Sequence, residues 1–322
     1  MQPPSDPSSA SSSASSSASS SGLSSGPSPT GVIHDIGYRG YDGPRLGRRA
    51  VARALFVHSL RGVFGIGRSA KSKVLPVGLS VIMCVPALVL AVVTVIGAGR
   101  GLLDDVPLDY SHYAMVLQAA LAIFLATQAP QTVSLDLRFN TLPLYVSRPL
   151  ERPDYVVAKY AAMTLGVFLL LAVPLLIMYV GALFAELPAG DETAEVAAAL
   201  VGAAIYALVL SGLALLIASL TSRRGFGVAG IITTLVMTYA VATALQGVVG
   251  IDNDDAVTAG WLGLISPMTL VDGVQVWALG TDPATPAGPA SDATGITFVL
   301  VTLAVVVGCL GLLVARYRKV RL

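Results

Sequence analysis

Six long apolar stretches divide this chain, and they constrain the fold more than any other feature. They cover roughly residues 74–98, 113–135, 160–185, 196–220, 225–251 and 294–315. A helix needs about 20 apolar residues to cross the ~30 Å hydrocarbon core of a bilayer, and every stretch reaches that length. Only 12% of the residues are charged, against about 25% in soluble domains. The sequence therefore predicts an all-α integral membrane protein with six transmembrane helices.

The basic residues predict the orientation of these helices. Nineteen of the twenty Lys and Arg residues lie in the N-terminal segment, in the second-to-third and fourth-to-fifth gaps, and in the C-terminal tail. Cytoplasmic loops retain Lys and Arg, so both termini are expected in the cytoplasm. The exception, Arg100, faces Asp104 and Asp105 in the first gap, where we expect a local ion pair. The three gaps on this other side hold thirteen of the nineteen acidic residues, which is compatible with the orientation.

The N-terminal part divides into two segments. Residues 1–30 are mostly Ser, Pro and Ala, a composition that cannot bury enough apolar area to fold, so we expect a disordered tail. Residues 31–73 form a cytoplasmic segment ahead of the six-span domain, residues 74–322. Within it, residues 45–66 predict a basic amphipathic helix that lies at the membrane interface with its Arg side chains toward anionic lipid. The alternative is that these Arg residues act only as a topology signal.

The gap before the sixth span contains a further apolar segment, residues 258–280, with a Trp near each end and Pro267 in the middle. Its length would allow a seventh span. A seventh span would place the basic tail outside the cell, against the charge pattern. We therefore expect a re-entrant or interfacial pair of short helices, broken at Ser266-Pro267, with Trp261 and Trp277 at headgroup depth.

Two glycine-rich motifs do not indicate nucleotide binding. Residues 225–230 match GxGxxG, but the motif opens an apolar helix instead of following a strand. Residues 65–72 approach the phosphate-binding loop, but Ala70 replaces its second glycine. The sequence also has no cluster of Cys and His residues. We expect no catalytic residue, no metal or cofactor site, and no nucleotide-hydrolysing activity in this chain. No ionisable residue lies in the middle of a predicted span, which argues against an ion-coupled transporter.

The gap between the second and third spans, residues 136–159, is the most specific segment. It mixes both charge signs with apolar residues and prolines, and such a mixture favours a docking surface. Its order is an acid (Asp136), an apolar turn, Ser147-Arg148-Pro149, a further Arg (Arg152), then Tyr155 and Lys159 at the start of the third span.

This order resembles the loop of the ABC-2 type transporter permease family. Six spans, cytoplasmic termini, a basic helix before the first span and an apolar segment before the sixth are also similar to that family's plan. The resemblance covers residues from about 45 to 322. It implies the permease subunit of a bacterial ABC exporter in the cell membrane, which pairs with a second copy or a paralogue. A separate cytoplasmic ATPase would bind ATP and dock on this loop. Glu151 departs from the pattern, since a small or polar residue is more usual there.

The resemblance assigns two sets of residues. Those expected to couple the chain to the ATPase are Asp136, Arg138, Arg148, Pro149, Glu151 and Arg152. Those expected to line the path are polar residues of the second and fifth spans, namely Gln128, Thr234, Thr238 and Tyr239. Two alternatives are a non-transporting membrane scaffold that recruits a cytoplasmic partner through the same loop, and an ATP-independent channel or carrier. The substrate stays open, and no nucleic acid is expected as a partner.

Overall fold

The computed structural model describes residue 43 and residues 47–67, 70–134, 136, 139, 150–221, 223–252 and 256–319. The chain divides into two units, residues 1–45 and 46–322, and every described helix belongs to the second. The predicted disordered tail lies outside the described residues. The described part consists of helices, turns and bends and contains no strand, in agreement with the predicted all-α class.

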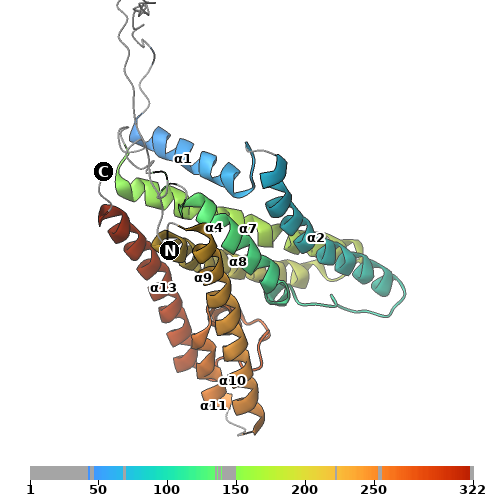
Figure 1. The fold of residues 1–322 in the computed structure, drawn as a ribbon. Helices are drawn as coiled ribbons and strands as arrows, with labels where there is room; N and C mark the ends of the chain where they lie inside the picture. Colours follow the sequence, from blue (N-terminus) through green and yellow to red (C-terminus); the bar gives the residue numbers. More distant parts are fainter. Residues whose placement is uncertain are drawn as a thin grey trace, which may run out of the picture. The chain divides into compact units, whose positions relative to one another are not determined.

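Among the described residues, five helices are long and apolar enough to cross a membrane (Figure 1). Each overlaps a predicted span and begins before it, by between one and eight residues. The five are α2 (Ala70–Gly99), α7 (Arg152–Phe184), α8 (Ala189–Leu220), the composite α9–η2–α10 and α13 (Asp292–Lys319). The composite helix consists of α9 (Arg224–Ile232), the π-helical η2 (Thr233–Met237) and α10 (Thr238–Asp252).

The second predicted span is not one straight helix. The 3-10 turn η1 (Tyr110–His112) and α3 (Tyr113–Val116) are followed by α4 (Gln118–Thr132), and the two parts meet at an angle of 61°. With 15 residues, α4 alone extends about 22 Å, which is short of the ~30 Å hydrocarbon core. The part of the chain that the structure describes therefore contains five candidate spans, or six if this bent pair counts as one.

Helix α7 lies at the centre of the unit and packs against α1 (Arg48–Val63), α2 and α8. Small residues let these helices approach closely. A side chain at Gly181 would meet the Cα of Ala91 in α2 at 2.7 Å, and one at Gly166 would meet Val63 of α1 at 2.8 Å. The predicted basic helix thus forms, and its Leu55, Ser59 and Val63 are buried in the fold.

The segment before α13 is broken at Ser266-Pro267, as predicted. Helix α11 (Ala256–Leu262) and η3 (Gly263–Ile265) end there, and α12 (Pro267–Val274) begins, followed by the π-helical η4 (Gln275–Leu279). The Ser266 hydroxyl accepts a hydrogen bond from the Met268 backbone N–H and caps α12. Every residue from Met268 to Val274 is buried, so α12 is an internal helix. The two Trp side chains are about 40% exposed.

Candidate functional site

The base of the predicted coupling loop is formed by the start of α7, which is tied to α1. The Arg48 guanidinium donates to both carboxylate oxygens of Asp154, at 2.6 and 2.8 Å, and also pairs with Glu151. Glu151 and Asp154 in turn form a capping box at the first turn of α7. A bidentate pair fixes geometry as well as charge, so α1 is held to α7 at this point.

A largely buried ion pair joins the end of α4 to α7. The Lys159 ammonium lies 3.0 Å from the Asp136 carboxylate and donates to the Thr132 carbonyl at 2.9 Å. Tyr155 donates to the same carboxylate at 2.6 Å, and its ring lies 5.3 Å from that of Tyr317 in α13. The Thr132 carbonyl is among the last of α4, where a cation is favourable.

Two further Arg residues connect helix ends in the same region. Arg152 donates to the Arg318 carbonyl at 2.5 Å, and Arg316 donates to the Ser219 carbonyl of α8 at 2.7 Å. Helix C-termini leave carbonyls without intrahelical partners, and these guanidinium groups supply donors. We call this region, defined by Arg48, Asp136, Arg152, Lys159 and Arg316, the basic end.

Three of the predicted coupling residues therefore have partners within the fold. Asp136 pairs with Lys159, Glu151 with Arg48, and Arg152 with the end of α13. The other three, Arg138, Arg148 and Pro149, lie outside the described residues, so the structure does not test their assignment. The sequence did not predict the contact between α1 and this region. Arg48 and Asp154 are 106 residues apart, and no local sequence pattern indicates that they pair.

The predicted path-lining residues lie on two of the helices and do not form one cluster among the described contacts. Gln128 is buried in α4, and its amide donates to its neighbour Thr127 at 3.3 Å. Thr234 lies within the π-helical turn η2 and Thr238 directly follows it, and the Thr238 hydroxyl donates to the Thr234 carbonyl. Tyr239 is partly buried. Their role in a path stays a prediction.

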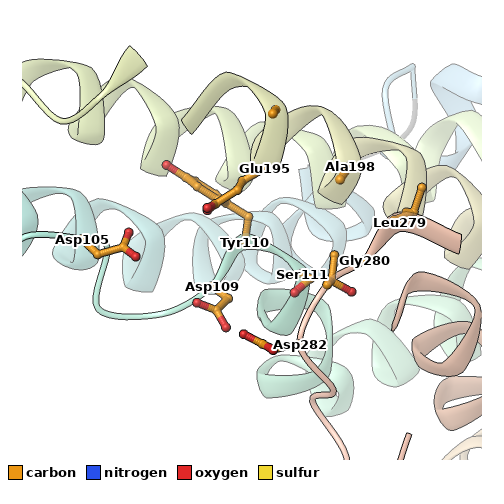
Figure 2. A pocket seen from close by; sticks show the side chains of 11 residues that line it. Asp105, Asp109, Tyr110, Ser111, Glu195, Ala198, Leu279, Gly280 and Asp282 are labelled. Carbon is orange, nitrogen blue, oxygen red and sulfur yellow. The ribbon is translucent and has the colours of Figure 1, made fainter. Parts of the chain in front are cut away.

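The opposite end of the unit contains a cavity that the sequence did not reveal. It has a volume of about 310 Å³ and is lined from three segments: the loop after α2, the first turns of α8, and the end of η4 with the residues that follow. Figure 2 shows Tyr110 between Glu195 and Asp109, with Asp105 to the left and Asp282 below Asp109 in this view. We call it the acidic-end cavity. The sequence indicated this cavity only through the concentration of acidic residues in the three gaps on the side with few Lys and Arg residues.

Among the described residues, the lining of the cavity includes four acidic side chains and no Lys or Arg. Its charged lining residues are Asp105, Asp109, Glu195 and Asp282. Behind them, Glu192 is 4% exposed and accepts a hydrogen bond from the Tyr110 hydroxyl at 2.5 Å. The expected pairing of Arg100 with Asp104 or Asp105 is absent from the ion pairs of the described residues. Asp105 instead accepts from the backbone N–H of Val106 at 2.6 Å.

The loop that closes the cavity is held by a buried carboxylate of α12. Asp272 accepts hydrogen bonds from the Thr285 hydroxyl at 2.9 Å and from the Ala284 backbone N–H at 3.3 Å. Burial raises the pKa of Asp272, and the two hydrogen bonds oppose that rise. The chain between η4 and α13 is therefore anchored to the core instead of spreading into solvent.

Comparison with known proteins gives no relative: neither a protein-family model nor a curated protein matches this chain. What the structure supports by itself is a multi-pass α-helical membrane protein, because its long helices are apolar and many of their large side chains are exposed.

Proposed function

We propose that this chain is the permease subunit of an ATP-driven ABC exporter in the bacterial cell membrane. In this proposal both termini face the cytoplasm, and the chain forms the translocation path with a second copy or a paralogue. A separate ATPase binds ATP and docks on the loop within residues 136–159. The observation that carries the proposal is the convergence of four helices, α1, α4, α7 and α13, at the two ends of that loop.

The contacts at the loop ends supply a physical route for coupling. A displacement of the loop acts on α4 through Asp136, on α1 through Arg48, and on α13 through Arg152. Helix α7 starts at the loop and continues for 33 residues, which is about 50 Å. A tilt imposed at its first turn is thereby carried to the acidic end, where α7 is followed by α8.

The path itself is assigned to polar residues of α4 and of the fifth long helix. Thr234 lies in the π-helical turn η2, and Thr238 follows it directly. Such turns widen a helix locally and are frequent at functional sites. This feature supports Gln128, Thr234, Thr238 and Tyr239 as lining residues without assigning a substrate.

The test replaces residues 140–149 with a Gly/Ser linker of equal length and leaves Asp136, Glu151 and Arg152 in place. The chain is purified together with the ATPase encoded by a neighbouring gene, in lipid nanodiscs. We expect the wild-type chain to retain the ATPase and stimulate its ATP hydrolysis, and the linker variant to lose both while it still inserts in the membrane. The control replaces the exposed Arg100–Leu102 turn with Gly-Gly-Ser and is expected to keep both.

Three outcomes would overturn the proposal. An ATPase that stays bound and stimulated after the linker replacement would place docking elsewhere. A loop partner without ATPase activity would identify a membrane scaffold. Solute flux through the purified chain without ATP would identify a channel or carrier.

A further inference from the structure

The last turns of α8 and α13 form an open groove on the surface of the protein. Its volume is about 490 Å³, and its lining consists of Leu216, Leu220, Leu312, Ala315, Arg316 and Lys319. The two helices are in direct contact beside it. A side chain at Gly212 of α8 would meet the Cβ of Cys309 in α13 at 3.1 Å. Further along, Arg316 donates to the Ser219 carbonyl at 2.7 Å. These two contacts are seven residues apart on each helix, so the helices run parallel here for about two turns.

The apolar part of the groove belongs to helices that are candidate membrane spans. Both α8 and α13 are long and apolar enough to cross a bilayer, and the Leu residues of the groove lie within them. Leu220 is 59% exposed and Leu312 is 58% exposed. Exposed Leu side chains on a spanning helix contact lipid chains, which are as apolar as Leu itself. The groove volume also lies within the usual range of ligand pockets, about 300 to 1,000 Å³. The groove therefore fits a hydrocarbon chain better than a polar solute.

One end of the groove carries positive charge. The last turn of α13 contains the basic residues Arg316, Arg318 and Lys319. Arg316 donates to the Ser219 and Leu220 carbonyls, at 2.7 and 3.4 Å, and so compensates the negative end of α8. Lys319 is exposed, and it takes part in none of the ion pairs among the described residues. The described lining of the groove includes no Asp or Glu. The charge of Lys319 is therefore available to an anion in the groove.

A second groove of similar size shows what distinguishes the first. It lies between α2 and α7, has a volume of about 460 Å³, and is lined by apolar residues alone, Leu88 and Phe184 among them. Such a groove accepts the chains of any lipid, because nothing in it interacts with a headgroup. The groove between α8 and α13 combines an apolar wall with cations at one end. This combination is complementary to a phospholipid whose headgroup has a net negative charge.

We propose that the groove between α8 and α13 binds an anionic phospholipid, with an acyl chain against its three Leu side chains and the phosphate beside Lys319. Basic pockets between membrane helices bind anionic headgroups in this way. The Lys319 ammonium donates to the phosphate oxygens, and Arg316 adds positive charge from a position that the α8 carbonyls fix. The inference requires only a bilayer around the long helices, and it is independent of ATPase docking.

The test measures lipid binding to the full purified chain by native mass spectrometry, which resolves each bound lipid. Phosphatidylglycerol and phosphatidylcholine with identical acyl chains are titrated in about 0.15 M ammonium acetate, which screens distant surface charges. We expect the first phosphatidylglycerol to bind about tenfold more tightly than the first phosphatidylcholine. In Lys319→Gln this ratio should fall to about twofold, whereas Lys319→Arg keeps the charge and should keep the ratio. Lys319 is exposed, so both variants should remain folded.

A second pair of variants tests the apolar wall. Leu312→Trp fills the groove and should lower the ratio as far as Lys319→Gln does, because the acyl chain no longer fits beside the cation. The control is Leu88→Trp in the apolar groove between α2 and α7. Leu88 is exposed to nearly the same extent, 56% against 58%, and this variant should leave the ratio unchanged.

The matched charge control is Lys73→Gln at the exposed start of α2, which should also leave the ratio unchanged. Equal losses in Lys319→Gln and Lys73→Gln would mean diffuse surface attraction and would overturn the proposal. So would equal affinities of the wild-type chain for the two lipids, or an unchanged ratio in Leu312→Trp. Displacement of the lipid by glycerol phosphate would identify an anion site without an acyl chain. A dimer that Leu312→Trp dissociates and that excludes the lipid would place a second copy in the groove, and either result would equally overturn the proposal.

Discussion

At the basic end, where α7 begins and α13 ends, acidic side chains are paired with basic ones; at the acidic end, where α8 begins, they line a cavity together. Asp136 meets Lys159 and Asp154 meets Arg48, whereas the described lining of the cavity places no Lys or Arg beside Asp105, Asp109 and Glu195. Both ends contain carboxylates, so the presence of acidic residues alone does not decide their roles.

The difference lies in what each arrangement can do. Paired charges at the basic end connect helices that are distant in sequence and are suited to transmitting a displacement. Carboxylates gathered in one cavity raise its negative potential. Under the proposed function the basic end is the junction through which motion passes, whereas the acidic end is a cavity with an acidic lining. The following predictions separate these two descriptions, in order of decreasing effect.

The largest effect is expected for the buried pair at the basic end. Lys159 is 7% exposed, and removing one partner of a buried pair costs about 3–5 kcal/mol because the other charge stays buried. Asp136→Ala should therefore lower the free energy of unfolding by about 3 kcal/mol, measured by reversible unfolding in mixed micelles. The double variant Asp136→Leu/Lys159→Met should lower the free energy of unfolding by less than the sum of the losses in the single variants Asp136→Leu and Lys159→Met. Additive costs would show that the pair does not connect the helices.

A smaller effect is expected at the acidic end, for the hydrogen bond between Tyr110 and Glu192. Tyr110→Phe leaves the buried Glu192 carboxylate without this donor, which should cost about 1–3 kcal/mol. The control is Tyr179→Phe, which removes an exposed hydrogen bond to Thr193 between α7 and α8 and should cost under about 0.5 kcal/mol. The same unfolding assay measures both. Equal costs would mean that the wall of the cavity is not organised by this contact.

The positions of most helices could be predicted from the sequence, but their starts could not. Helices α7 and α8 begin several residues before their apolar stretches, at Arg152 and Ala189. Acidic residues occupy the first turn of each, Asp154 in α7 and Asp191 with Glu192 in α8. Such residues stabilise a helix N-terminus but reduce hydropathy, so a search for apolar runs excludes them.

The break in the second predicted span could not be predicted because, apart from Gln118, the residues on both sides of Leu117 are mostly apolar. It coincides with tertiary contacts: the Tyr113 hydroxyl donates to the Met83 carbonyl of α2, and Tyr110 contacts Glu192 of α8. Both partners are at least 30 residues away. Single-sequence periodicity contains no information about such contacts, and the same limit hid the acidic-end cavity.

The coupling role of the loop at the basic end stays a prediction, although the structure shows contacts at its two ends that the sequence did not reveal. The loop was recognised from its mixed charges and prolines, and the structure places Asp136, Glu151 and Arg152 at its two ends. These three residues have partners within the fold, which fits a role in transmitting motion. In the proposed function, direct contact with the ATPase is assigned to residues between them, which include Arg138 and Arg148.

The smallest change in stability is expected for Arg48, and it separates a structural role from a coupling role. The pair with Asp154 is largely exposed, with side-chain exposures of 47% and 21%, and exposed pairs contribute about 0–1 kcal/mol. Arg48→Ala should therefore lower the free energy of unfolding only slightly, and Arg49→Ala, on the same helix, should not change it measurably. If α1 takes part in coupling, Arg48→Ala also reduces stimulation of the partner ATPase several-fold while Arg49→Ala does not. Equal stimulation in both variants would leave α1 as a packing element only and would confine the junction to α4, α7 and α13.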